Sequence, residues 1–412
     1  MTKKLKDSGI EWVGEIPEDW LLVKYKRFAK SGMGVTLLKS DLLDRETADS
    51  IPVYSATQGN EFFGYTENKK LLLECGDLVI PARGNSIGHI KVVDKTATST
   101  QTTIYSKVFS NEINIMFLKY CSDGLKDNWF EFDNTAIPQI TVNQVNNNPV
   151  PYPSLKEQEK IVKILNKITQ KVDNILKQTQ QSIKELKKYK QSLITESVTK
   201  GLDPNVEMKD SGVGWIGNIP KHWKFIKGKY IYKKLQRPIR CDEIVTAFRD
   251  GQVMQRSKRR TEGFTNSLKE IGYQGVEKGD LVIHSMDAFA GAIGISQDNG
   301  KCSPVCIVLN SFNSNIYNPY FSYLMRVYSY LGYIESMAKG IRVRSSDFKY
   351  HTFANTFLLI PKLQEQQQIV QYLDNKISTI DRLIENKTKV IVELENYKKS
   401  LIYEYVTGKK EV

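Results

Sequence analysis

Basic residues are concentrated in one stretch of the second half of the chain. Between positions 237 and 260 the sequence holds Arg237, Arg240, Arg249, Arg256, Lys258, Arg259 and Arg260, with Gln252 among them. A guanidinium group binds phosphate or forms two parallel hydrogen bonds with guanine, and an amide such as that of Gln252 can pair with adenine. Arg342 and Arg344 follow later and alternate with apolar residues, as on one face of a strand. These residues predict a nucleic-acid-binding patch; a solvated basic surface is the alternative interpretation.

The first half is less basic, and all of its candidates except Arg83 are polar and uncharged. The segment PARGNSIG, 81–88, places Arg83, Asn85 and Ser86 directly after an apolar run that ends at Ile80. Gln101, Gln139 and Asn143 lie in further polar segments, and the corresponding loop of the second half carries His284 and Asp287. Polar side chains in loops also satisfy turns, so both a binding role and a structural role are open for each of them.

The residue patterns of common catalytic motifs are missing from the sequence. There is no GxxxxGK[ST] loop for a nucleotide, no HExxH pair for a metal, and no Asn/Asp-Pro-Pro-aromatic tetrapeptide of adenine methyltransferases. The histidines (His89, His222, His284 and His351) are far apart, and no cysteine has a positioned histidine. We therefore expect a protein without a catalytic site, a metal site or a cofactor of its own.

Composition narrows the class of partner. The chain of 412 residues has 59 Lys and Arg against 46 Asp and Glu, a formal net charge of +13. This excess favours nucleic acid, an anionic membrane or an acidic protein as partner, or it only confers solubility. No apolar run approaches the roughly 20 residues that cross a bilayer, and no secretion signal is visible. Five scattered cysteines are typical of reduced thiols, so we expect a cytoplasmic protein that does not bind membranes.

The sequence contains the same frame twice. KDSGIEWVGEIPEDW at 6–20 matches KDSGVGWIGNIPKHW at 209–223 in nine of fifteen positions, and GDLVI at 76–80 recurs at 279–283. A third block, PSLKEQEKIVKIL from Pro153, recurs as PKLQEQQQIVQYL from Pro361 and continues without a gap to YKQSLITESVT, which recurs as YKKSLIYEYVT. Three blocks in one order indicate a tandem duplication. The segments between the blocks differ, which suggests one structural role performed twice and one recognition role performed differently each time.

A long helix is predicted after each of these prolines. Roughly 45 residues follow without another proline, and without glycine until Gly201 and Gly408, which is typical punctuation for a single helix. In the second copy apolar residues follow three- and four-residue steps from Leu373 to Tyr405, with Lys387 and Lys398 at two of the steps. The first copy keeps this rhythm from Ile161 through Ile175 and slips by one near Thr179. The heptad pattern predicts a coiled coil. An antiparallel pair within the chain would bury both seams; a helix of another chain or subunit is the alternative.

These features together resemble the specificity subunits of type I restriction–modification enzymes, and the resemblance covers nearly the whole chain. It rests on the two half-repeats, the Pro-x-Leu-x-Glu-Gln block that leads into a long helix ending in YK-x-SLI, and the GDLVI strand before a glycine-containing loop. The fold class we expect is α+β, a pseudo-two-fold tandem repeat of two mixed α/β target-recognition domains separated by two long helices in an antiparallel intramolecular coiled coil. The expected order is a target-recognition domain at 1–153, a spacer helix at 154–201, a second target-recognition domain at 202–360 and a second spacer helix at 361–412.

The resemblance also implies a function and partners. In that family each recognition domain reads half of a split double-stranded DNA target, and two unlike domains imply an asymmetric target. Two methyltransferase subunits and motor–nuclease restriction subunits are the implied protein partners, and S-adenosylmethionine, ATP and Mg²⁺ are expected on those partners. A free-standing DNA-binding regulator or architectural protein with the same duplicated frame is one alternative. A single-chain nuclease or methyltransferase with an unrecognised motif is another.

Overall fold

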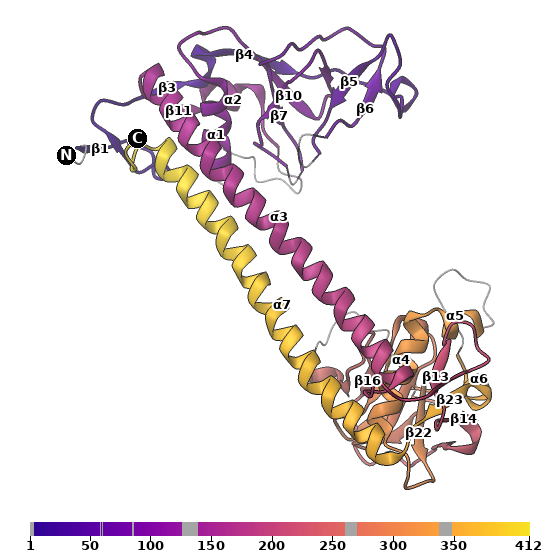
Figure 1. Cartoon of the computed structure of the whole chain (residues 1–412). Coiled ribbons are helices and arrows are strands. Elements are labelled where there is room, and N and C mark those ends of the chain that lie inside the picture. The colour runs from indigo at the N-terminus through magenta and orange to yellow at the C-terminus, as the bar shows by residue number, and fades with distance from the viewer. Residues whose placement is uncertain are drawn as a thin grey trace. The chain divides into compact units, whose positions relative to one another are not determined.

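The structure is a computed structural model that describes residues 4–57, 59, 61–84, 86–125, 139–259, 270–337 and 348–412. The chain forms two compact units, one from Met1–Gln181 together with Lys387–Val412 and one from Ser182–Asn386. Each unit combines a mixed α/β domain with parts of both long helices (Figure 1).

A four-stranded antiparallel sheet lies at the centre of the mixed domain in the first unit. Its strand order is β4 (Ala29–Met33), β10 (Thr103–Val108), β7 (Leu78–Pro81) and β8 (Lys91–Val92). β7 contains the end of the repeated GDLVI segment and is buried along its whole length, as expected for an apolar strand that is covered on both faces. Helix α1 (Ile115–Leu125) lies against β8 and buries its apolar face in the same core.

Smaller elements complete this domain. β5 is the central strand of a three-stranded sheet, and two further pairs, β1–β2 and β3–β11, are antiparallel. Their bounds are β1 (Leu5–Asp7), β2 (Glu15–Pro17), β3 (Leu21–Lys24), β5 (Ile51–Tyr54), β6 (Gly64–Thr66), β9 (Thr98–Ser99), β11 (Pro149–Tyr152), α2 (Val142–Asn147) and the short 3-10 helices η1 (Tyr25–Arg27) and η2 (Lys39–Asp41).

The second unit repeats the central sheet with the same strand order. Its strands are β15 (Tyr232–Lys234), β22 (Cys306–Ser311), β19 (Leu281–His284) and β20 (Ile293–Ile295), and the second GDLVI segment forms β19 in the place that β7 takes in the first sheet. The remaining elements are β12 (Met208–Asp210), β13 (Asn218–Pro220), β14 (Lys224–Lys227), β16 (Val245–Ala247), β17 (Val253–Gln255), β18 (Gln274–Val276), β21 (Gly300–Cys302), β23 (Phe357–Ile360), α4 (Asn318–Tyr330), α5 (Tyr333–Met337), α6 (Tyr350–Asn355), η3 (Gly228–Tyr230), η4 (Arg256–Lys258) and η5 (Ala288–Ala290).

The two long helices, α3 (Leu155–Lys200) and α7 (Leu363–Val406), lie side by side and run in opposite directions within each unit (Figure 1). In the first unit Lys398 Nζ of α7 pairs with Asp173 Oδ1 of α3 at 2.6 Å. In the second unit Lys190 Nζ of α3 pairs with Asp381 Oδ1 of α7 at 2.7 Å. The expected fold class is therefore confirmed: two mixed α/β domains, and two long helices that form an antiparallel coiled coil within one chain.

The heptad seam of α7 is confirmed at every expected position. The buried or half-buried residues of the seam are Leu373, Ile377, Ile380, Ile384, Lys387, Ile391, Leu394, Lys398, Leu401 and Tyr405. Nearly all other positions between them are exposed. The expected seam of α3 is wrong at one residue. Ile175 is 45% exposed, and Leu176 occupies the seam instead, because α3 takes two four-residue steps in succession around this point. Among the described helices, none is apolar enough over sufficient length to cross a bilayer.

The tryptophan that ends each N-terminal repeat block attaches its domain to the start of a long helix. Trp20 Nε1 donates to Glu157 Oε2 at 3.2 Å, and Trp223 Nε1 donates to Glu365 Oε1 at 2.9 Å. Both indoles are buried, and a buried N–H without a partner costs about 1–3 kcal/mol. The first and third repeated sequence blocks therefore meet at the same joint in both units.

The glutamine that follows each of these glutamates is fully buried and satisfies backbone groups. Gln158 accepts a hydrogen bond from the amide of Asn114, just before α1, at 2.8 Å and donates to the carbonyl of Pro153 at 3.0 Å. Gln366 accepts from the amide of Tyr317, just before α4, at 2.8 Å and donates to the carbonyl of Pro361 at 2.9 Å. The repeated Glu-Gln pair thus fixes the start of each long helix against its own domain.

The glycine after each long helix lies against the tryptophan of the other sequence repeat. Gly201 has a φ of +78°, and a Cβ there would lie 3.4 Å from the ring of Trp223. Gly408 has a φ of +73°, and a Cβ there would lie 3.0 Å from the ring of Trp20. Glycine suits both positions because it adopts positive φ without strain. At Gly408 it also leaves room for the ring of Pro17, which would lie 2.5 Å from a Cβ.

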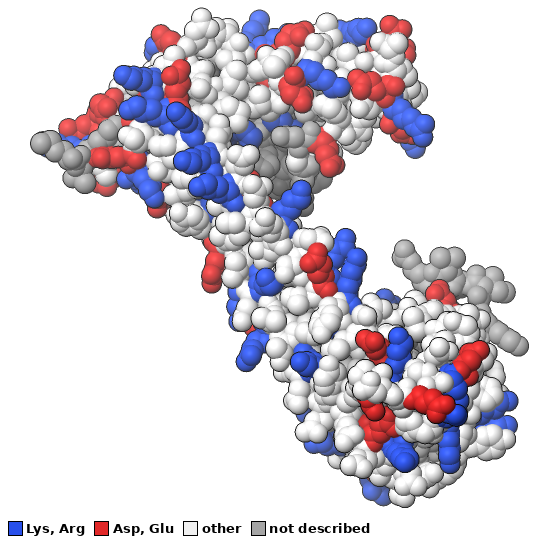
Figure 2. All heavy atoms as spheres, in the orientation of Figure 1, with Lys and Arg blue, Asp and Glu red and all other residues white. Residues whose placement is uncertain are grey.

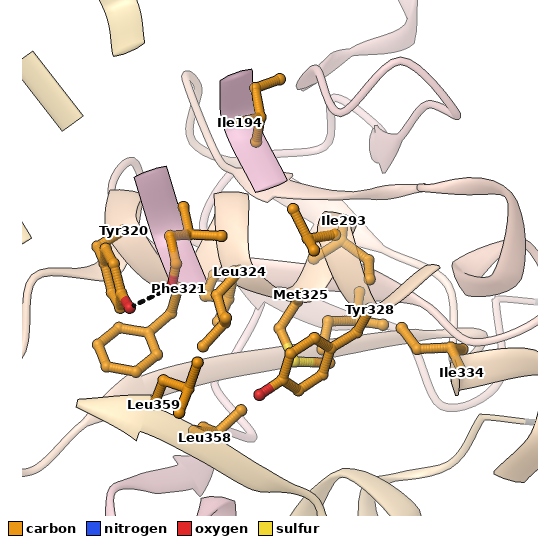
Figure 3. Packing of buried hydrophobic residues seen from close by; sticks show 14 of the residues in the cluster. Ile194, Ile293, Tyr320, Phe321, Leu324, Met325, Tyr328, Ile334, Leu358 and Leu359 are labelled. Atoms are coloured by element: carbon orange, nitrogen blue, oxygen red, sulfur yellow. Dashed lines mark hydrogen bonds between the residues drawn. The ribbon is translucent and has the colours of Figure 1, made fainter. Parts of the chain in front are cut away.

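The core of the second unit shows how a long helix completes a domain (Figure 3). Ile194 of α3 belongs to the same buried cluster as Leu324 and Met325 of α4 and Leu359 of β23. The Tyr320 hydroxyl donates to the carbonyl of Val198 on α3 at 3.0 Å. The first unit is built in the same way, with Leu401 and Ile402 of α7 in its core.

Candidate nucleic-acid interface

In the second domain, the loop after β19 meets the turn between β16 and β17. Arg249 Nη2 donates to Asp287 Oδ1 at 2.7 Å, and its guanidinium lies 5.9 Å from the ring centre of Phe289. The amide of Asp287 donates to His284 Nδ1 at 3.2 Å. Three residues that the sequence singled out, Arg249, His284 and Asp287, therefore lie in one cluster.

Arg259 and Gln252 form a second group on the β16–β17 hairpin and the segment that follows it. Arg259 Nη1 donates to Asp250 Oδ1 at 2.9 Å and to Gln252 Oε1 at 3.3 Å, and its guanidinium lies 4.2 Å from the ring centre of Phe248. Burial opposes ionisation of Asp250, but the hydrogen bonds from Arg259 and the Gln252 amide prevail and lower the pKa of its carboxyl. This guanidinium is held in place by an acid and an aromatic ring, with part of it exposed.

Other basic residues of the predicted patch are engaged in ion pairs. Arg237 binds Asp280, which is only 2% exposed, and also approaches Glu277 at 3.3 Å. Arg240 is largely exposed and lies 3.8 Å from Glu277, and Lys258 pairs with Asp298. Arg256 lies close enough to His284 for its charge to act on the imidazole. Arg237 thus serves the fold of this domain, whereas Arg240 and Arg249 present most of their side chains to solvent.

In the first domain, three of the predicted polar segments converge. Arg83 and Gln139 are joined by a backbone bridge, and the amide of Ile140 donates to the carbonyl of Ala82 at 2.9 Å. The amide of Ala82 donates to the carbonyl of Thr102 at 2.9 Å, which places the loop of Arg83 beside Gln101. Arg83 and Gln101 are exposed and Gln139 is half-buried, so this surface offers one guanidinium and two amides.

Two further predicted residues of this domain, Ser86 and Asn143, lie in different surroundings. Ser86 is buried, so its side chain faces the interior. Asn143 is exposed on α2, and its Oδ1 accepts a hydrogen bond from Asn147 Nδ2 at 2.9 Å. The remaining predicted residues, Asn85, Arg260, Arg342 and Arg344, lie outside the described residues.

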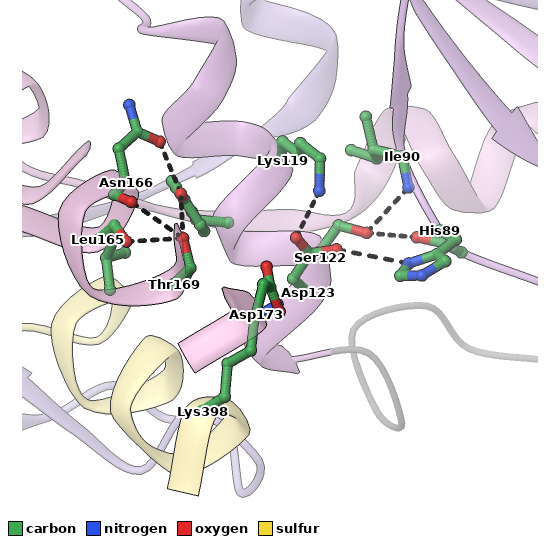
Figure 4. A network of polar contacts seen from close by, with 12 residues as sticks. His89, Ile90, Lys119, Ser122, Asp123, Leu165, Asn166, Thr169, Asp173 and Lys398 are labelled. Atoms are coloured by element: carbon green, nitrogen blue, oxygen red, sulfur yellow. Dashed lines mark hydrogen bonds and ion pairs between the residues drawn. The ribbon is translucent and has the colours of Figure 1, made fainter. Parts of the chain in front are cut away.

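A polar network connects the loop that carries Arg83 to the long helix (Figure 4). Ser122 Oγ on α1 donates to the carbonyl of Gly88, and the amide of Ile90 donates to Ser122 Oγ at 3.1 Å. Two residues earlier on α1, the Tyr120 hydroxyl donates to Asn166 Oδ1 of α3 at 2.6 Å. α1 therefore holds the loop and the helix in a defined relation inside the first unit.

Sequence reasoning missed a hydroxyl-rich group in the first domain. Ser55, Thr100 and Thr102 are linked through their hydroxyl oxygens, with distances between 2.8 and 3.2 Å. The buried Lys91 donates to the carbonyl of Ser55 at 3.0 Å. The available signal was a lysine between Ile90 and Val92 in an otherwise apolar strand.

On the face drawn in Figure 2, Lys and Arg side chains are interspersed with Asp and Glu over each mixed domain. This agrees with the ion pairs of Arg237, Arg249 and Arg259. Within the described part of the chain no group of three or more His, Cys, Asp or Glu side chains could hold a metal ion.

The same frame is folded twice, and the loop after the equivalent strand carries different polar side chains in each copy. This arrangement defines a class of protein that presents two unlike surfaces. The chain belongs to the family of type I restriction modification DNA specificity domains, whose model matches residues 17–185 and 243–396. The two matched ranges fall in the two halves of the duplication.

Two relatives match nearly the whole chain. The type I restriction enzyme MjaVIII specificity subunit of Methanocaldococcus jannaschii is 23% identical over 421 residues, covering 96% of this chain and 94% of the relative. The putative type I restriction enzyme MjaX specificity subunit of the same organism is 24% identical over 444 residues, covering 97% of this chain and 96% of the relative.

Two solved structures share the fold. A chain from a structure on complex assembly and conformational transition of the type I R-M system has a TM-score of 0.69 at 14% identity, covering 96% of this chain and 99% of that chain. The HsdS subunit from Thermoanaerobacter tengcongensis has a TM-score of 0.53 at 14% identity, covering 96% and 98%. The comparisons do not favour a free-standing regulator.

Proposed function

We propose that each mixed domain of this chain reads one half of a bipartite DNA target, and that the chain directs methyltransferase and restriction subunits to that target. The observation that carries this proposal is the position of the two candidate surfaces. Both are built around the loop that follows the same strand of the same sheet, β7 in one unit and β19 in the other.

The difference between the two surfaces supports an asymmetric target. The first offers the amides of Gln101 and Gln139 and one guanidinium, Arg83, whereas the second offers Arg249 and Arg259 beside acids and aromatic rings. Amides favour adenine and guanidinium groups favour guanine in the major groove. Two domains with different donors should therefore select different half-sites.

The helix pair is suited to set the distance between the half-sites. At 1.5 Å per residue, a helix as long as α3 extends for about 69 Å. The seam residues and the ion pairs Asp173–Lys398 and Lys190–Asp381 fix the register of the pair inside each unit. We propose that this register determines the number of base pairs between the two halves of the target.

Exposed apolar residues on the helices are candidate contacts for the methyltransferase subunits. Ile175, Val390 and Tyr397 are exposed on the helices of the first unit, and Tyr189 and Leu383 on those of the second. The repeat aligns Ile175 with Leu383 and Tyr189 with Tyr397, so each unit offers an equivalent pair. We propose that two methyltransferase subunits bind there, one on each unit, and that motor–nuclease subunits join the complex.

We further propose that the chain is not itself a catalyst. On this proposal S-adenosylmethionine, ATP and Mg²⁺ are bound by the partner subunits, and this chain supplies target recognition only. We place the complex in the cytoplasm, where the free thiols of all five cysteines would stay reduced.

Methylome sequencing tests the proposal. A host that expresses the chain with its methyltransferase partner should carry a gapped, asymmetric methylation motif that is absent without the chain. Exchanging residues 224–360 for those of a relative should change one half of the motif, and exchanging 21–150 should change the other half. A change in both halves from either exchange would disprove one reader per domain, and methylation by the chain without its partner would show that it is an enzyme.

A further inference from the structure

The interior of the first domain contains a lysine without an acidic partner. Lys91 on β8 is 2% exposed and donates from Nζ to the carbonyl of Ser55 and to Thr57 Oγ1, both at 3.0 Å. Among the described residues no carboxylate pairs with this ammonium, and burial lowers its pKa. Removing a cation from water without a counter-charge is unfavourable, so packing alone does not explain this lysine.

The repeated frame does not require a lysine at this position. Lys91 lies opposite Val79 in the β7–β8 pair, and Gly294 lies opposite Val282 in the β19–β20 pair. Val79 and Val282 are the same residue of the repeated GDLVI block. A Cβ at Gly294 would lie 2.0 Å from the carbonyl oxygen of Gly251, so the second domain has no room for a side chain there. Lys91 is therefore a feature of the first domain that the repeated frame does not share with the second domain.

The buried lysine of the second domain provides a contrast. Lys301 on β21 pairs with Glu270 at 2.6 Å and with Asp242 at 3.4 Å. The hydrogen bond to Glu270 raises the pKa of its ammonium. Its charge is compensated inside the protein, whereas that of Lys91 is not.

Thr57 connects Lys91 to the surface. Its Oγ1 accepts a hydrogen bond from the lysine, so its own O–H remains available as a donor, and no acceptor for it is found among the described residues. Thr57 is only half-buried. A hydroxyl that accepts a bond from an ammonium is polarised and becomes a stronger donor.

The same group borders the candidate interface. Ser55, whose carbonyl accepts from Lys91, has its hydroxyl 3.2 Å from that of Thr102. The carbonyl of Thr102 accepts from the amide of Ala82, the residue before Arg83. An anion bound at Thr57 would therefore lie in the region of the first domain's other candidate contacts.

We propose that Thr57 and Lys91 form a phosphate-binding site of the first domain, in which the Thr57 hydroxyl donates to a phosphate oxygen of the DNA backbone and Lys91 supplies the compensating charge. The inference rests on the proposed function and deepens it by assigning one backbone contact. Backbone contacts position a protein on the duplex without reading bases. The site is thus expected to hold the first domain in place while its amides read the sequence.

Salt dependence of DNA binding tests the site. Full-length wild type and the variants Lys91→Met and Thr57→Val, each assembled with the methyltransferase partner, are titrated with a duplex that contains the target and with an unrelated duplex. Each phosphate contact contributes a slope of about −0.9 in log affinity against log salt. We expect Lys91→Met to make the slope shallower by about that amount on both duplexes, Thr57→Val to shift it in the same direction, and the methylation motif to stay unchanged.

Lys301→Met is the matched control. It removes a buried lysine whose charge is already compensated, so it should lower the melting temperature without changing the slope. An unchanged slope in both Lys91→Met and Thr57→Val, with tight binding by the wild type, would overturn the phosphate site and leave the proposed function intact. A wild type that gives neither DNA binding nor methylation with its partner would instead overturn the proposed function.

Inorganic phosphate distinguishes the source of the anion. At constant ionic strength, phosphate without DNA should not change the melting temperature of the wild type relative to Lys91→Met, because a DNA phosphate is held by the whole interface. Stabilisation of the wild type alone by the free ion, with an unchanged DNA slope, would show that the site binds inorganic phosphate and not the DNA backbone.

Discussion

The imidazole of His284 lies at the end of β19, directly beside the candidate surface of the second domain. Burial lowers its pKa below the ordinary 6.5; Asp287 opposes this shift, and the charges of Arg256 and Arg249 reinforce it. The neutral ring accepts a hydrogen bond from the Asp287 amide at 3.2 Å. Protonation would remove this acceptor and add a cation beside two guanidinium groups.

This environment predicts a pH-dependent stability of the second unit. Because the folded pKa lies below the unfolded value, the unfolded chain binds the proton more readily, and acidification favours unfolding. We expect stability to be retained above about pH 6.5 and to fall as the pH drops from there toward the folded pKa. His284→Asn, whose amide oxygen can still accept from the Asp287 amide, should lack this part of the decline in urea unfolding. If wild type and variant lose the same free energy of unfolding as the pH falls, His284 is not the cause of the decline.

At the residue scale, sequence reasoning located groups of candidate side chains but not their partners. The arginine-rich segment was apparent, yet Arg237 is bound by Asp280, 43 positions further along the chain. Such pairing depends on which strands become neighbours, and a single sequence does not reveal it. Lys91 was missed because a lysine in a short strand is ordinarily a surface residue.

At the scale of elements, the slip in α3 makes a sharp prediction. Leu176 lies on the seam and Ile175 points outward, although they are adjacent. Leu176→Ser should destabilise the isolated chain by about 1–3 kcal/mol, because it places a hydroxyl in the seam, whereas Ile175→Ser should stay within about 0.5 kcal/mol of wild type. Chemical unfolding of both variants measures this difference. If Ile175→Ser were the more destabilising variant, the seam would run through Ile175 instead of Leu176.

The elements differ in how far they could be predicted. The long helices were predictable because the heptad pattern, the prolines and the glycines are local signals. The position of the slip was not, because steps through Ile175 and through Leu176 fit the apolar pattern equally well and only the facing helix selects between them. Strand order was also out of reach: β4 pairs with β10, more than 70 positions away, and strands this short have little pattern of their own.

At the scale of the whole molecule, the ruler role of the helices can be tested by length. Inserting one heptad into both α3 and α7 keeps the seam in phase and adds about 10 Å. With about 3.4 Å per base pair, the gap in the methylation motif should grow by about three base pairs while both half-sites stay the same. The control is a heptad in α3 alone, which breaks the antiparallel register and should destabilise the chain. A gap of unchanged length in the double insertion would remove the ruler role.

Neither folded unit consists of a single sequence repeat. Leu401 and Ile402 of the second repeat complete the core of the first unit, and Leu193 and Val198 of the first repeat complete the core of the second. The arrangement is domain swapping performed inside one polypeptide. A fragment with one repeat alone would expose the part of its domain core that the helix end of the other repeat covers. Two copies of such a fragment could each cover the core of the other with the end of their long helix. When two such copies are fused into one chain, they no longer need to be identical. The binding surface of one domain can then change while that of the other stays the same.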